Sequence, residues 1–253
     1  MIRFLIKKTF YDFLDNAFIL ALLNLIFLVL SAIPFLLPHL FEMAVPIKIA
    51  VFICGLFICS WYGSIVLYGV SSISDYKTFS FKHLKDSVKK TPICGICITV
   101  LLCFVIVSVN FILPFYLLLD SMPAFIFASL VFWLTFFAIV TFQFFLSVRL
   151  RLNSNIIETI KKCFIIFFDN KCFCIFCFFC GFTLIVFSVI TGFLFPGPAG
   201  LILFFDEALR LRLLKYDTEK TGSTKILWNI LLKEECEKTP HRSLRTIFFP
   251  WKD

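Results

Sequence analysis

The feature that most constrains this sequence is a series of long blocks without Asp, Glu, Lys or Arg. Five of them are long enough to matter and cover 17–37, 49–70, 93–119, 124–148 and 172–195. About 20 apolar residues in a helix cross the roughly 30 Å hydrocarbon core of a bilayer. A helix satisfies its own backbone hydrogen bonds, as lipid requires. The sequence therefore predicts an all-α fold, a polytopic transmembrane helical bundle.

The composition excludes a water-soluble domain. Hydrophobic residues make up 60% of the chain and charged residues 16%, whereas soluble domains are about half apolar and about a quarter charged. The net charge of +8 is best explained by basic residues in the loops, which orient membrane spans. A nucleic-acid partner is not expected, because it needs a basic face on a folded soluble surface.

A sixth helix is predicted over 198–216. The uncharged block that begins at 172 continues too far for one crossing, and the run Pro196–Gly200 contains two prolines and two glycines that break a helix. The segment after this break carries Asp206 and Glu207 near its middle. We expect a short or re-entrant sixth helix that completes a bundle over 1–216, followed by a short cytoplasmic tail over 217–253.

The distribution of basic residues predicts the orientation. With six crossings and both termini in the cytoplasm, Lys48 is the only one of the 24 Lys and Arg residues outside. With five crossings the basic residues of the tail move outside, against the positive-inside rule. We therefore expect a cytoplasmic N-terminus and a cytoplasmic C-terminus.

Four polar residues of the predicted spans are candidates for function: Asp206, Glu207, Arg210 and Asn24. A charge at the centre of a span costs about 2.5–3.5 kcal/mol on the insertion scale. One structural interpretation is that the last helix lies partly in the interface, and another is that Arg210 pairs with Asp206 one turn away. The functional interpretation is that the two acids line a polar cavity that handles protons or substrate. Asn24 is expected to face protein rather than lipid.

Two basic segments between spans are predicted to form short amphipathic cytoplasmic helices. The first, 71–90, contains five lysines that are candidates for contact with anionic headgroups or with a soluble partner such as an ATPase. These lysines are Lys77, Lys82, Lys85, Lys89 and Lys90. The second, 153–169, is expected to begin at a cap formed by Asn153 or Ser154. Its inward face is expected to carry Ile156, Ile157, Ile160, Phe164 and Phe167.

No known catalytic or metal-binding motif is present. The spacing of Cys94 and Cys97 and of the run Cys174–Cys180 resembles an iron–sulfur pattern, but its fourth position is Leu184. The three histidines are scattered, and there is no HExxH, no GxSxG and no P-loop. We therefore predict no catalytic residues, cofactor or metal, and we expect the cysteines to pack as small hydrophobic side chains.

Further features lie within the first span, at span ends and in the basic loops. They are Asn24-Leu25, Ser31, Pro34, the segment Gly63–Tyr68, the loop Tyr76–Lys90, the segment Arg149–Asn170 and the short helix Ala208–Tyr216. In these features the chain resembles the YesL-like family of bacterial integral membrane proteins, although it departs from the pattern between Phe35 and Lys48 and is richer in Cys and Phe. The resemblance implies a location in the bacterial cytoplasmic (inner) membrane. The family has no established biochemical activity, and its members are often encoded beside carbohydrate-uptake systems.

The leading functional hypothesis is a non-catalytic accessory or component of a small-solute transport system, with carbohydrate as one candidate solute. Its expected partners are anionic lipids and other membrane transport subunits. One alternative is a self-contained small-solute transporter. A further alternative is a membrane-embedded enzyme that uses Asp206 and Glu207.

Overall fold

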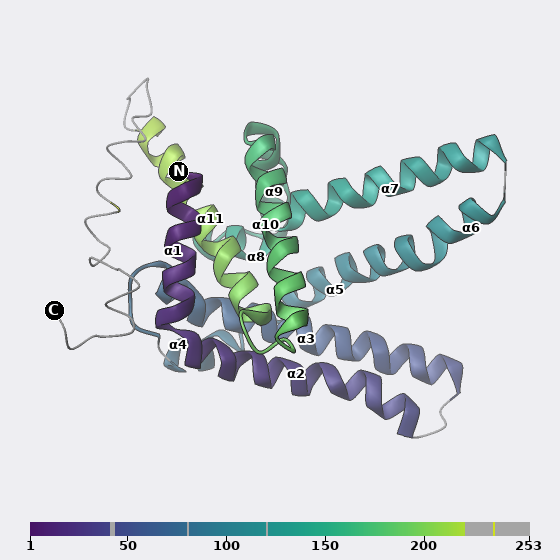
Figure 1. Ribbon diagram of the computed structural model, residues 1–253, viewed down its shortest axis with the longest axis horizontal. Helices are drawn as coiled ribbons and strands as arrows, with labels where there is room; N and C mark the ends of the chain where they lie inside the picture. Colours follow the sequence, from purple (N-terminus) through teal and green to yellow (C-terminus); the bar gives the residue numbers. More distant parts are fainter. Residues whose placement is uncertain (41–43, 80, 120, 221–234, 236–253) are drawn as a thin grey trace. The chain divides into compact units, whose positions relative to one another are not determined.

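The computed structural model describes residues 1–40, 44–79, 81–119, 121–220 and 235 (Figure 1). Within these ranges the chain forms helices and turns and no strand, which confirms the predicted all-α class. The helices are α1 Ile2–Asp15, α2 Ala17–Leu40, α3 Val45–Ser74, α4 Phe81–Ser87, α5 Pro92–Val107, the π-helix η1 Ser108–Ile112, α6 Leu113–Leu118, α7 Met122–Phe142, α8 Phe145–Leu152, α9 Ile156–Asp169, α10 Lys171–Ile190 and α11 Gly197–Lys220.

Five helical stretches of the described chain are long and apolar enough to cross a membrane. They are Ala17–Pro38, Val45–Ser74, Pro92–Leu118, Met122–Leu152 and Lys171–Ile190. Many of their large apolar side chains are exposed on the protein surface, an arrangement that suits lipid better than water. The fold is therefore that of a multi-pass membrane protein, whereas α11 is not among these five stretches.

Several helix ends differ from the sequence-based expectation. Helix α3 begins at Val45 and ends at Ser74, so it extends beyond both ends of the block 49–70. Helix α10 ends at Ile190, five residues before the expected end. The cause is a turn in which Gly192 and Phe193 both have positive φ, at 63° and 62°, because a right-handed helix cannot continue through left-handed residues. The chain thus breaks before the prolines.

The chain divides into two compact units. The first contains Met1–Leu25, Val66–Lys85 and Gly181–Asp253, and the second contains Ile26–Ile65 and Asp86–Cys180. In the first unit α1 packs beside α11 (Figure 1). In the same unit a β-carbon built on Gly181 would lie 2.7 Å from the ring of Phe205, so α11 runs back closely along the end of α10.

The second unit is held by close helix contacts and aromatic packing. A β-carbon added to Gly95 of α5 would lie 2.9 Å from the backbone Cα of Trp61, and the Trp61 indole donates to Thr91 Oγ1 at 3.1 Å. Between α7 and α9, the ring of Phe137 lies 5.0 Å from that of Phe167 in an edge-to-face arrangement. Small residues and edge-to-face rings both favour such close approach.

Helix α9 corrects two details of the prediction. Its N-cap is Asn155 rather than Asn153 or Ser154, because Asn153 adopts a left-handed conformation that ends α8. Ile157 points outward with 70% of its surface exposed. The buried face instead begins at Thr159, whose hydroxyl donates to the carbonyl of Asn155 at 2.8 Å. Because this polar group is satisfied locally, the helix can bury it.

The lysine-rich segment contains a shorter helix than expected. Helix α3 extends to Ser74, and Tyr76 then turns the chain with a φ of 59°. Among the described residues between Tyr76 and Lys90, the helical part is α4, which ends at Ser87. Val88 lies beyond its end. Lys77, Lys85, Lys89 and Lys90 are exposed, and the side chain of Lys82 lies outside the described residues.

Candidate functional site

The candidate site begins on one face of α1, a helix that the hydropathy pattern did not predict. This face buries side chains at helical spacing: Leu5, Lys8, Thr9, Asp12 and Phe13. Leu5 and Phe13 supply apolar packing at its two ends, and Lys8, Thr9 and Asp12 lie between them. Because residues three and four apart share one helix face, a single stripe of α1 presents an ammonium group, a hydroxyl and a carboxylate together.

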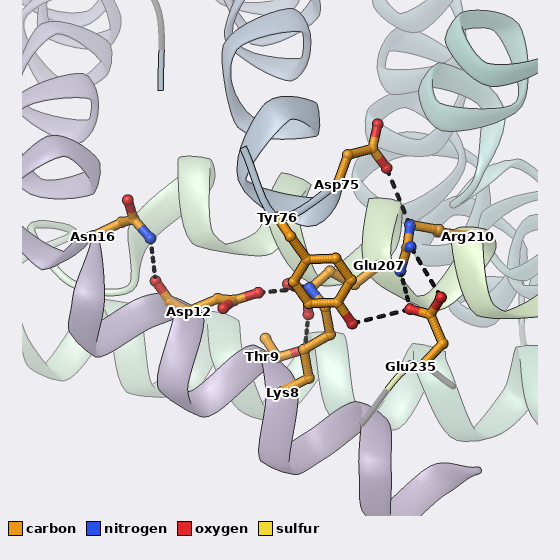
Figure 2. A network of polar contacts seen from close by, with 9 residues as sticks. All are labelled: Lys8, Thr9, Asp12, Asn16, Asp75, Tyr76, Glu207, Arg210 and Glu235. Atoms are coloured by element: carbon orange, nitrogen blue, oxygen red, sulfur yellow. Dashed lines mark hydrogen bonds and ion pairs between the residues drawn. The ribbon is translucent and has the colours of Figure 1, made fainter. Parts of the chain in front are cut away.

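Lys8 is the centre of a buried ion-pair network (Figure 2). Its Nζ donates to Asp12 Oδ2 at 2.6 Å and to Glu207 Oε1 of α11 at 2.8 Å. The Thr9 hydroxyl donates to the other carboxylate oxygen of Glu207. All four residues are at most 4% exposed. The network therefore fastens α1 to α11 and engages both carboxylate oxygens of Glu207.

The burial of these charges makes their pairing obligatory. Removing an ion from water costs several kcal/mol in a protein, and only close partners with good hydrogen-bond geometry offset that cost. Lys8 has two such carboxylate partners. The pairing therefore requires that α1 and α11 hold this register, since a shift of one residue along either helix separates the partners.

Arg210, three residues after Glu207 on α11, forms a second group of contacts. Its Nε lies 3.1 Å from Asp75 Oδ1. Its terminal nitrogens donate to Glu235, one to Oε2 at 2.7 Å and the other to Oε1 at 3.3 Å. A guanidinium with two parallel donors matches the geometry of a carboxylate. Arg210 thus holds a residue of the tail against the end of α3.

Tyr76 lies between the two groups (Figure 2). Lys8 Nζ lies 4.7 Å from the centre of its ring and Arg210 Cζ lies 4.9 Å from it, within the range of cation–π attraction. The Tyr76 hydroxyl donates to Glu235 Oε2 at 3.0 Å. Burial, with the charge of Glu235, raises the pKa of Tyr76 above its ordinary value. The phenol therefore stays protonated and acts as a donor.

Asn24 forms a separate polar contact at the start of α11. Its Nδ2 donates to the carbonyls of Leu194 and Pro196 at 3.0 and 2.6 Å, and its Oδ1 accepts from the backbone N–H of Ala199 at 2.8 Å. A β-carbon on Gly197, which has a φ of 62°, would overlap the Asn24 amide. Asn24 therefore fixes the loop before α11 and caps the first turn of that helix.

The predicted site residues occupy different places. Glu207 and Arg210 belong to the network, and Asp206, which lies on the same helix, is fully buried. Arg210 pairs with Asp75 and Glu235, and its predicted pairing with Asp206 stays a prediction. The sequence reasoning missed six residues of the network: Lys8, Thr9, Asp12, Asp75, Tyr76 and Glu235. The available signal was the spacing of Lys8 and Asp12 within an apolar stripe.

The described residues contain no group of three His, Cys, Asp or Glu side chains placed to hold a metal ion. The buried thiol of Cys163 on α9 illustrates the chemistry of the cysteines. Burial raises its pKa to about 12, so at neutral pH it is protonated. A protonated thiol is a poor nucleophile and a poor ligand.

No protein-family model, curated protein or solved structure matches this chain. The fold defines the class of the protein as an all-α, multi-pass membrane protein. The network of Lys8, Asp12 and Glu207 is a buried cluster of ion pairs within the described residues.

Proposed function

We propose that the protein is a non-catalytic integral component of a small-solute transport system in the bacterial cytoplasmic membrane, with both termini in the cytoplasm. The observation that carries this proposal is the engagement of Glu207. One carboxylate oxygen accepts from Lys8 and the other from Thr9. A general acid or base must reach a substrate within hydrogen-bond distance. A carboxylate enclosed in this way supports a structural role rather than an enzymatic one.

The arrangement of charges also supports an accessory role. The network joins α1 to α11, whereas the lysines at 77, 85, 89 and 90 are exposed. Exposed lysines beside apolar spans favour contact with anionic headgroups or with an acidic surface of another subunit. The proposed partners are therefore anionic lipids and other membrane transport subunits. Membership in the YesL-like family and carbohydrate as the solute remain part of this proposal.

The test combines topology with transport. Paired reporters at the C-terminus, one active only outside and one only in the cytoplasm, should give a cytoplasmic signal. The protein purified alone and reconstituted in liposomes should take up no labelled sugar, whereas deletion of its gene in the source cell should lower uptake of at least one sugar. Wild type and Glu207→Gln should restore that uptake equally at matched protein levels. Loss of restoration in a folded, membrane-inserted Glu207→Gln variant would favour the enzyme alternative.

A second candidate function is a self-contained transporter, and a break in one span favours it. The stretch Pro92–Leu118 contains the π-helix Ser108–Ile112. Within the described chain, the buried Ser108 hydroxyl has no hydrogen-bond partner. Single π-turns occur frequently at functional sites, and transporters bind solutes at interrupted helices. Uptake of labelled sugar by liposomes that contain this protein alone would establish this alternative.

A further inference from the structure

The contacts of Glu235 resemble those of a bound ligand. This residue lies 25 positions after Arg210 in the chain, and its side chain is buried to 2% exposure. Its carboxylate accepts two hydrogen bonds from the guanidinium of Arg210 and one from the hydroxyl of Tyr76. All three donors come from outside the tail, on α11 and at the end of α3.

The residues around this carboxylate are themselves held in place. Asp75 binds Nε of Arg210 at 3.1 Å, which leaves the two terminal nitrogens directed at Glu235. The guanidinium also stacks on the ring of Tyr76, with 4.9 Å from Cζ to the ring centre. Because the planar guanidinium is already oriented by the Asp75 carboxylate and the Tyr76 ring, it loses little conformational freedom when it binds a carboxylate. Two parallel N–H donors match the two oxygens of a carboxylate.

We propose that Asp75, Tyr76 and Arg210 form a carboxylate-binding site, that the Glu235 side chain is its resident ligand, and that a small carboxylate anion takes the same place when the Glu235 carboxylate is absent from it. Glu235 is then an internal competitor for the site. This inference rests on the geometry of the first unit and holds whether or not the protein belongs to a transport system.

The covalent connection sets how strongly Glu235 competes. Glu235 belongs to the same chain as the site, 25 positions after Arg210, and a ligand joined covalently to its site over a short distance in sequence has an effective concentration of about millimolar. A free peptide at micromolar concentration therefore cannot displace Glu235 from the wild-type site. It can bind only when the resident carboxylate is removed, and a small carboxylate must reach at least the same concentration range to compete.

The experiment uses the full chain in detergent micelles and a fluorescein-labelled peptide with the sequence of residues 231–239. Binding is followed by fluorescence anisotropy. The peptide should bind the Glu235→Gln chain at least about tenfold more tightly than the wild-type chain, which corresponds to one charge-assisted hydrogen bond. Glu234→Gln changes the tail charge equally and should bind like wild type. Equal binding to the wild-type and Glu235→Gln chains, or no binding to either, would overturn the proposal.

Further variants locate the site. In the Glu235→Gln background, Tyr76→Phe keeps the ring and Arg210→Lys keeps the charge. Each should weaken peptide binding about tenfold, because one removes a donor and the other removes the fork. Both variants should unfold near the temperature of their parent. Undiminished binding in both, with folding intact, would place the peptide elsewhere and overturn the proposal.

The last arm distinguishes the source of the carboxylate. Sodium acetate should displace the peptide from the Glu235→Gln chain, whereas sodium chloride at the same ionic strength should displace much less. A peptide with Gln at the position of Glu235 should not bind. Equal displacement by acetate and chloride would mean that salt screening, not carboxylate recognition, governs binding, and would overturn the claim that small carboxylates take the site.

Discussion

Removal of the Lys8 ammonium is the sharpest test of the buried network. Lys8 Nζ lies 2.6 Å from Asp12 and 2.8 Å from Glu207. At such a distance each attraction is worth about 6 kcal/mol with an effective dielectric constant of about 20, and desolvation of the ions offsets much of it. Breaking a buried ion pair by removing one partner costs about 3–5 kcal/mol. We expect Lys8→Met to lower the free energy of unfolding by that amount.

The two partners of Lys8 make the cost asymmetric. Lys8→Met leaves two carboxylates facing each other in a buried site, whereas Glu207→Gln leaves Lys8 paired with Asp12. Glu207→Gln should therefore cost only about 1–3 kcal/mol. The double variant should cost less than the sum of the two single variants by about 0.5–3 kcal/mol, because the second change removes the charge that the first one left unpaired.

Equilibrium unfolding of the full chain in mixed micelles with increasing dodecyl sulfate, followed by tryptophan fluorescence, gives these free energies. Lys7→Met is the matched control, because Lys7 lies beside Lys8 in the sequence and is exposed. It should leave the unfolding midpoint unchanged within error. Equal effects of Lys7→Met and Lys8→Met, or strict additivity of Lys8→Met and Glu207→Gln, would refute the reasoning about the network.

Three further predictions concern other parts of the chain. Asn24→Leu should lower stability by at least about 1–3 kcal/mol, because it leaves buried backbone groups unsatisfied; an unchanged unfolding midpoint would contradict this. Gly95→Ala should cost about 1–3 kcal/mol through overpacking against the Trp61 backbone, measured in the same unfolding assay, and a neutral effect would show that the helices separate easily. In native micelles at pH 7, N-ethylmaleimide should modify the exposed Cys172 well before Cys163, because burial raises the pKa of Cys163 to about 12; mass spectrometry of the labelled peptides gives the order.

The number of apolar spans was accessible from the sequence because it depends on local composition. A run of about 20 uncharged residues must form a helix in lipid whatever its neighbours are, and all five predicted blocks appear as long apolar helices. The ends of the helices were less accessible. Helix α10 stops at Ile190 because Gly192 and Phe193 adopt positive φ. The residue types of Thr191–Leu194 indicate this turn less clearly than the later prolines indicate a break.

The polar site was only partly accessible for a different reason. Asp206, Glu207, Arg210 and Asn24 stood out because they interrupt apolar sequence, but their partners did not. Lys8 in particular has the appearance of an ordinary loop charge, and it becomes a buried ion only because α1 packs beside α11.

The apolar runs alone thus establish a multi-pass helical membrane protein. The pairing of Lys8 with a carboxylate 199 residues away, and of Arg210 with the tail, arises from packing. Charges find such partners across the chain only after the helices have come together, and no local pattern encodes which partner that will be.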